Sequence, residues 1–316
     1  MLRGERAAVA RAITLIESRR ADHRGAAEAL IERLMPQAGR SVRLGVSGAP
    51  GVGKSTFIDA FGMYLLGAGH RVAVLAVDPS SKRTGGAILG DKTRMAALAR
   101  DERAFIRPSP AGGSLGGVAR HTRDAILVTE AAGFDIMIVE TVGVGQSETM
   151  VAEMVDLFLL LIAPGGGDDL QGMKKGIVEL ADLIVVTKDD GDLAPAARRA
   201  AADYRHALRL LGPAAADAIE VLAVSALQER GIDQVWQRLA HRIEAARESG
   251  AFAARRRQQA VAALWREIGD GLLDLFHADA EAARLLPDLE RRVAAGSITA
   301  AAAARLALQA FHGATR

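Results

Sequence analysis

The sequence predicts an α/β fold, in which a mostly parallel central sheet is flanked by helices and helical extensions lie at both ends. Three observations predict it. Short apolar runs alternate with helical stretches from about residue 41 to residue 250. These runs are almost continuously apolar, which is typical of parallel strands covered on both faces. Outside them the strand pattern is absent, so we expect an N-terminal helical extension over residues 1–40 and a C-terminal one over residues 251–316.

The N-terminal extension is expected to hold two helices. Apolar residues recur at helical spacing from Val9 to Ile16 and again from Ala27 to Met35. Gly25 lies between the two runs, and Pro36 and Gly39 follow the second, where a helix would end.

Seven apolar, β-branched runs, each followed by a turn signal, predict the strands of the sheet. They are Val42–Ser47, Val72–Val77, Phe105–Pro108, Ile136–Glu140, Leu157–Ile162, Leu183–Thr187 and Ile219–Val224. In an open sheet of this kind, ligands bind at the carboxyl ends of the strands.

Beyond Arg255 the sequence predicts helices alone. An amphipathic helix is expected from Val261 to Phe276 and a second from Leu285 to Val293. Ser297 or Thr299 could cap a last, alanine-rich helix that ends near Phe311. The pattern leaves two roles open for these helices, which either pack against the α/β domain or form an arm for oligomerisation.

Composition narrows the classes of function. Half of the 316 residues are apolar and the formal net charge is +2, with no long basic tract, so nucleic-acid binding is not expected. The absence of cysteine excludes disulfides, iron–sulfur clusters and cysteine nucleophiles. The N-terminus has no signal-peptide core, and the most apolar run, Met154–Ala163, contains an aspartate and is too short to span a bilayer. We therefore expect a cytoplasmic protein with no membrane association.

The stretch GVSGAPGVGKST predicts a phosphate-binding loop. Its core fits G-x-x-x-x-G-K-[ST] and lies between a predicted strand and a predicted helix, which identifies a P-loop NTPase. Backbone N–H groups of such a loop converge on phosphate oxygens. We expect Lys54 to reach the β- and γ-phosphates and Ser55 to bind Mg²⁺. The loop residues expected to bind nucleotide are Gly48, Gly51, Val52, Gly53, Lys54, Ser55 and Thr56.

Carboxylates at the same sheet edge predict a metal site. Glu140 ends an apolar strand, and Gly143 follows it as the expected γ-phosphate-sensing glycine. Asp78 follows the second strand, and Asp91 lies in the loop after it. With Ser55, these three carboxylates are the expected Mg²⁺ ligands.

The base-binding motifs favour GTP over ATP. Lys188 and Asp190 form T-K-x-D after a strand, where GTPases use N-K-x-D. The aspartate accepts hydrogen bonds from guanine N1–H and N2–H₂, a donor pair that adenine lacks. Ser225, Ala226 and Leu227 follow the last strand and fit the S-A element, whose backbone N–H meets guanine O6. Thr187 replaces the usual asparagine, which braces neighbouring loops, so the change could weaken nucleotide affinity without changing the choice of base.

The chain resembles the MeaB/ArgK (MMAA-like) GTPases. The resemblance is carried by GAPGVGKST, VDPSSKRTGGAILGDKTRM, IVETVGVGQSE and APGGGDDLQGMKKGIVELADLIVVTKDDGD. It implies a homodimeric GTPase whose C-terminal helices form the dimer contact. It also implies a metallochaperone role, in which GTP gates the loading and protection of an adenosylcobalamin-dependent acyl-CoA mutase, usually methylmalonyl-CoA mutase.

The resemblance also assigns roles to residues. It implies that Asp78, Asp91 and Glu140 are metal and switch carboxylates. The segment Gly165–Gly176, with Gln171, Lys174 and Lys175, looks like the family's extra switch, although its composition also fits an ordinary surface loop.

We expect Mg²⁺-assisted hydrolysis that depends on positioning and charge neutralisation, with Lys54, Asp91 and Glu140 as catalytic residues. Turnover is expected to be slow alone and stimulated by the partner, with Lys174 as the candidate charge. Gln146 either orients water or is a plain loop residue, and Arg94 either acts as an arginine finger or pairs with an acid.

Two other functions are alternatives. A small-molecule kinase of the ArgK type, linked to amino-acid transport, would need an acceptor pocket and a base, and the sequence shows no such constellation. A GTPase that inserts nickel would show histidine- or cysteine-rich tracts, whereas the seven histidines are scattered.

Overall fold

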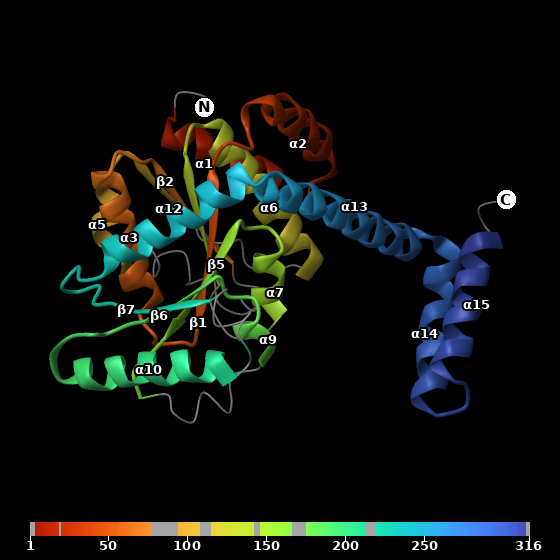
Figure 1. Ribbon diagram of the computed structural model, residues 1–316. Coiled ribbons are helices and arrows are strands. Elements are labelled where there is room, and N and C mark those ends of the chain that lie inside the picture. Colours follow the sequence, from red (N-terminus) through yellow and green to blue (C-terminus); the bar gives the residue numbers. More distant parts are fainter. Residues whose placement is uncertain are drawn as a thin grey trace. The chain divides into compact units, whose positions relative to one another are not determined.

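The computed structural model describes residues 4–18, 20–77, 94–107, 115–141, 146–165, 175–210, 212 and 219–313. The chain divides into two units, Met1–Arg257 and Gln258–Arg316, each of which is compact by itself. In the first unit, helices cover both faces of a central sheet (Figure 1). Among the residues described, no helix combines the length and the hydropathy needed to cross a bilayer.

The sheet has seven strands in the described part of the chain, in the order β3-β2-β4-β1-β5-β6-β7, and every pairing is parallel. The strands are β1 (Val42–Gly48), β2 (Val72–Val77), β3 (Ala104–Arg107), β4 (Ile136–Thr141), β5 (Leu157–Ile162), β6 (Leu183–Val186) and β7 (Glu220–Ala223). The predicted fold class is therefore confirmed. The longest strand, β1, lies in the interior of the sheet between β4 and β5, so its carboxyl end opens at the middle of the sheet edge.

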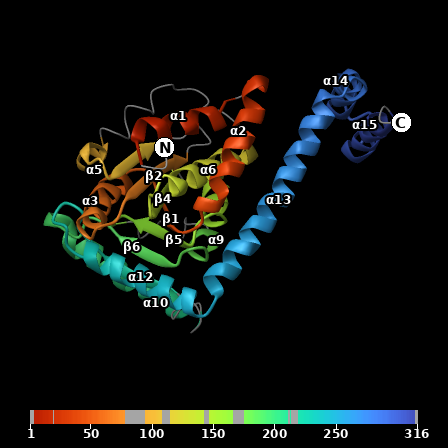
Figure 2. The same cartoon turned by 90° about the horizontal axis from the view of Figure 1, so that it is seen from above.

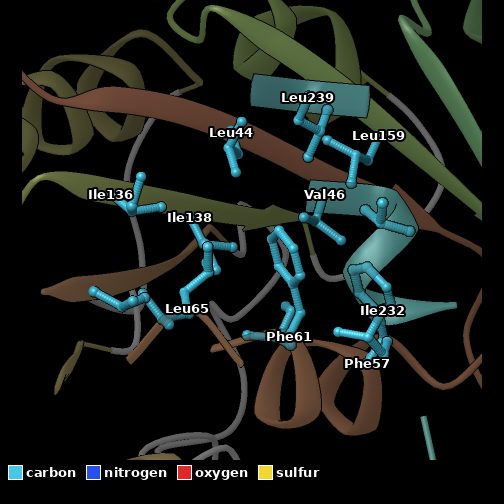
Figure 3. Close-up of a cluster of buried hydrophobic side chains, with 14 of the residues drawn as sticks. Leu44, Val46, Phe57, Phe61, Leu65, Ile136, Ile138, Leu159, Ile232 and Leu239 are labelled. Carbon is cyan, nitrogen blue, oxygen red and sulfur yellow. The ribbon is translucent and has the colours of Figure 1, made fainter. Parts of the chain in front are cut away.

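One face of the sheet packs against α3 (Lys54–Gly67), α5 (Ala96–Arg100) and α12 (Ile232–Glu248). Alternate strand residues such as Leu44, Val46 and Ile138 meet the α3 aromatic side chains in this core (Figure 3). Phe57 and Phe61 stack with their ring centroids 5.4 Å apart. This packing fixes α3, and with it the loop that leads from β1 into α3.

The other face is covered by two groups of helices. The helices α1 (Arg6–Ile16), α2 (Ala21–Leu34), α6 (Leu115–Ala131) and α7 (Gln146–Ala152) form one core with the strand residues whose side chains point away from α3. Beside β5, β6 and β7 a second core is formed by α9 (Lys175–Val178) and α10 (Ala194–Leu210). Figure 2 shows α1, α2 and α6 grouped on one side of the sheet.

The two predicted N-terminal helices are present, but the predicted break at Gly25 is wrong. The break falls after Glu17, where the Ser18 hydroxyl lies 2.8 Å from His23 Nδ1, and Gly25 lies inside α2. An exposed glycine destabilises a helix by about 1 kcal/mol relative to alanine, and this cost is too small to end α2 at Gly25. A short 3₁₀ turn, η1 (Met35–Gln37), ends this region at the predicted Pro36.

The second unit is helical. The long helix α13 (Ala251–Ala278) runs from the first unit into the second, followed by α14 (Ala280–Ala294) and α15 (Ala300–Gly313). Leu289 of α14 packs with Ala303 and Ala307 of α15. Thr299 caps α15 as one of the two predicted candidates, because its hydroxyl accepts from the Ala302 N–H at 3.3 Å.

Candidate nucleotide-binding site

The loop between β1 and α3 needs glycine for steric reasons. A Cβ at Gly48 would lie 2.5 Å from the backbone oxygen of Leu161 on β5. Gly51 and Gly53 have φ of +79° and +98°, a region that L side chains rarely adopt. The loop therefore lies with its backbone against the carboxyl end of β5 and leads directly into the N-terminus of α3, as a phosphate-binding loop requires.

Lys54 is the first residue of α3 and lies over this loop. Its ammonium donates to the carbonyl of Gly48 at 2.7 Å and to that of Ala49 at 3.2 Å, and the side chain is buried. Burial lowers the pKa of Lys54, and the negative charges of Glu140 and Glu148 oppose that shift. A buried cation at the mouth of a glycine loop is placed to bind a phosphate oxygen.

Two buried carboxylates supply the charge around Lys54. Glu140 lies on β4 in register with Val46 of β1. Glu148 lies on α7 and accepts a hydrogen bond from the Ser147 hydroxyl at 3.2 Å. Sequence reasoning did not single out Glu148, because an acid within a short amphipathic run is usually exposed. Because Glu148 is buried and its charge acts on Lys54, we add it to the candidate residues of this site.

The described donors fit Mg²⁺ by their chemistry. Ser55, in the first turn of α3, and Glu140 both offer oxygen, the ligand that Mg²⁺ prefers. Asp78 and Asp91 lie outside the described residues, as do Gly143, Gln171 and Lys174. Within the described ranges no group of three or more histidine, cysteine, aspartate or glutamate side chains could hold a metal.

Thr187 ties the base-binding motif to the phosphate loop. Its hydroxyl donates to the Val52 carbonyl at 2.7 Å and lies 3.2 Å from the Ile162 carbonyl. The adjacent Lys188 has a φ of +60° and donates from Nζ to the Gly51 carbonyl at 2.9 Å. The threonine thus makes a contact between neighbouring loops of the kind expected of the asparagine that it replaces.

The two predicted base-binding loops also contact each other. The Ser225 hydroxyl donates to the carboxylate of Asp190 and accepts from the Gln228 N–H at 3.0 Å. Ala226 is half-buried and the Leu227 side chain is exposed. The structure therefore brings Lys54, Glu140, Lys188, Asp190 and Ser225 to the same edge of the sheet.

This parallel sheet with a glycine loop and a buried lysine after its interior strand defines a P-loop nucleotide-binding protein. Residues 9–281 match the family described as Methylmalonyl Co-A mutase-associated GTPase MeaB. The chain belongs to this family, and it is therefore a member of a family of GTPases. The predicted resemblance is confirmed.

Relatives and solved structures agree with this membership. A protein of Caulobacter vibrioides named as a GTPase is 57% identical over 98% of this chain and 95% of its own length. The Mus musculus protein named Methylmalonic aciduria type A homolog, mitochondrial, is 45% identical over 98% of this chain and 78% of its own. The solved structure of a LAO/AO transport system kinase has a TM-score of 0.76 at 40% identity, covering 98% of this chain and 94% of that one.

Proposed function

We propose that this protein is a GTP-hydrolysing chaperone of an adenosylcobalamin-dependent acyl-CoA mutase, most specifically methylmalonyl-CoA mutase. The observation that carries the proposal is the family match over residues 9–281, since the family is named for its association with that mutase. The carboxylate of Asp190, held at the sheet edge beside Ser225, supports the choice of guanine. The bound nucleotide would set the conformation of the protein, and the mutase would recognise that conformation. We propose the cytoplasm as the compartment.

Each described residue would have a defined task in hydrolysis. Lys54 would release the Gly48 and Ala49 carbonyls and transfer its hydrogen bonds to phosphate oxygens. Ser55 and Glu140 would hold Mg²⁺, which neutralises charge on the phosphates. Asp190 would accept from the guanine N–H groups while Lys188 lies against the base. Asp78, Asp91 and Lys174 remain proposed for the metal and the partner-dependent step.

The C-terminal helices are proposed as a homodimerisation arm. Apolar side chains along one side of α13 are exposed, including Trp265 at 66% and Leu264 at 58%. Monomeric proteins rarely leave a contiguous apolar stripe in water, so a second copy of the chain is the proposed cover.

The test is GTP hydrolysis by the purified protein, alone and with methylmalonyl-CoA mutase from the same source. We expect slow GTP turnover alone, clear stimulation by the mutase, and less turnover of ATP than of GTP. Fast turnover without a partner would contradict the proposed regulation. A mutase that leaves the rate unchanged would contradict methylmalonyl-CoA mutase as the partner, and faster turnover of ATP would contradict the role of Asp190.

A second candidate is a kinase, favoured by the 40% identity to a solved protein that is named a transport system kinase. A kinase transfers the γ-phosphoryl group to an acceptor, whereas a GTPase releases it as inorganic phosphate. The same assay separates the two, because stoichiometric release of phosphate without an added acceptor excludes obligatory transfer.

A further inference from the structure

Asp189, the variable position of T-K-x-D, is buried between two arginines. Its carboxylate accepts from Arg198 Nε of α10 at 3.1 Å through Oδ1, and Arg230 Nη2 lies 3.1 Å from Oδ2. The same Arg230 nitrogen donates to the backbone carbonyl of Asp189. The Asp189 N–H donates to the Val224 carbonyl at 2.9 Å. Asp189 therefore uses its side chain and both backbone groups to fix one loop.

Arg230 extends this contact to the second base-binding loop. Its backbone pairs with that of Ser225 through two hydrogen bonds of 3.0 Å, which close the loop between them. The Ser225 hydroxyl in turn donates to the Asp190 carboxylate. Asp189, Arg230, Ser225 and Asp190 thus form a closed ring, in which each residue is joined to the next by a hydrogen bond, an ion pair or the chain itself.

We propose that the Asp189–Arg230 pair is a positioning device for base recognition, which holds the Asp190 carboxylate at the angle needed to accept both guanine N–H groups. The proposal rests on the proposed binding of guanine by Asp190. It adds that the x residue of the motif and an arginine of the other loop share the task of aiming Asp190.

The physical reason is preorganisation. A carboxylate that accepts two parallel hydrogen bonds must lie in the plane of the base, and loops that move independently would lose that geometry. A ring fixed before the nucleotide arrives removes this ordering cost from binding. Arg198 contacts the same carboxylate but comes from the helix that follows the same loop, so it does not join the two loops.

The test compares Arg230→Ala with Arg198→Ala in the full-length protein. Equilibrium dissociation constants are measured for GDP and for IDP, whose base lacks the exocyclic amine, together with Tm. Loss of two hydrogen bonds predicts that Arg230→Ala weakens GDP binding about tenfold. IDP binding should weaken less, so the preference for GDP over IDP falls. Arg198→Ala should leave that preference unchanged.

Three results would overturn the inference. They are an unchanged GDP affinity in Arg230→Ala, an equal loss for GDP and IDP, and an equal effect of Arg198→Ala. If Arg230→Ala does not fold, Arg230→Met gives the same comparison, because it keeps the aliphatic part of the side chain, removes the guanidinium and leaves the pair of Asp189 with Arg198 in place. Failure of the proposed guanine binding by Asp190, on which the inference rests, is a separate result, because the wild-type protein would then bind ADP as tightly as GDP.

Discussion

A single hydroxyl explains how this protein does without the usual asparagine in its base-binding motif. Thr187 is buried and donates to the Val52 carbonyl of the phosphate loop. Asparagine and threonine both offer a donor there, and the loop carbonyl needs one because a buried, unsatisfied acceptor is costly. The contact between the loops, whose loss was the reason to consider a weaker affinity, is therefore present with threonine.

We predict that Thr187→Val weakens GTP binding, because valine keeps the shape and removes the donor. Leaving the Val52 carbonyl unpaired costs about 1–3 kcal/mol. When the whole of this cost falls on the nucleotide-binding form of the loop, the dissociation constant for GTP should rise roughly five- to 150-fold. Thr187→Asn is the matched control and should bind GTP as the wild type does. Equal affinities for all three proteins in a calorimetric titration would contradict the prediction.

The site could be predicted at the residues that carry a motif and not at those that support them. Lys54, Asp190 and Ser225 were identifiable because their spacing follows the chemistry of phosphate and guanine. Glu148 and Asp189 were not, because nothing in a single sequence shows that α7 buries an acid beside Lys54 or that Arg230 returns to the T-K-x-D loop. Such contacts join distant parts of the chain.

The segment that leads into β1 is held by charged groups from two helices. Glu130 of α6 accepts from the Gly39 N–H at 2.7 Å and the Ser41 hydroxyl at 2.5 Å, and it pairs with Arg43 at 2.8 Å. Arg256, at the start of α13, donates to the Gly39 and Ser41 carbonyls, both at 2.7 Å. This segment determines where β1 starts, and so it supports the phosphate loop at the other end of the strand.

We predict that Glu130→Gln destabilises the protein at neutral pH. Burial raises the pKa of Glu130, but Arg43, Ser41 and Gly39 lower it by more, so the pKa of this carboxyl lies below its ordinary value. A carboxyl group whose pKa is lower in the folded than in the unfolded protein stabilises the fold at pH values above the unfolded pKa. This stabilisation is lost as the pH falls through the folded pKa. The loss in Glu130→Gln should be roughly 3 kcal/mol at neutral pH.

Urea unfolding at pH 7 and at pH 4 checks this prediction. The difference between wild type and Glu130→Gln should be smaller at pH 4, since the carboxyl of the unfolded chain begins to bind a proton there and the stabilisation from the lowered folded pKa shrinks. Asp22→Asn is the control, because its ion pair with Arg20 is exposed and its loss should leave stability unchanged. A constant difference at both pH values would show that Glu130 does not act through its charge.

The elements of the sheet were predictable because each strand is a nearly uninterrupted apolar run. The strand positions agree with the predicted runs, while the ends shift by a residue or so, as at β3, which begins at Ala104. The order of the strands was not predictable, since it depends on which helices cover which face. The prediction of a helix break at Gly25 was wrong because an exposed helix position tolerates a glycine.

At the scale of the whole molecule, α13 carries a row of exposed apolar side chains of the kind that proteins usually bury against a partner. Residues Val261, Leu264, Trp265, Ile268, Leu272 and Leu275 recur at helical spacing, and each is at least 40% exposed. The sequence alone left packing and oligomerisation equally open. An oligomerisation arm is our proposal for this stripe, and packing against the α/β domain is the alternative that a measurement of mass in solution tests.

We predict that Leu264→Asp with Trp265→Asp converts a dimer into a monomer, because two charges on an apolar stripe prevent its burial. Sedimentation of the purified protein would measure the mass. Asp274→Lys, an exposed substitution on the opposite side of the helix, should leave the dimer intact. A wild-type protein that sediments as a monomer at every concentration would contradict the proposed arm.

The position of β1 inside the sheet also sets when the protein can fold during its synthesis. β1 leaves the ribosome early, yet its neighbours β4 and β5 follow only after residues 49–135 have been made. Until Ile162 has emerged, an apolar strand made for the interior of the sheet has an open edge, which exposes the nascent chain to aggregation. A chain that terminates before that residue is therefore expected to stay incompletely folded and to be bound by chaperones or degraded, and not to form a shortened nucleotide-binding protein.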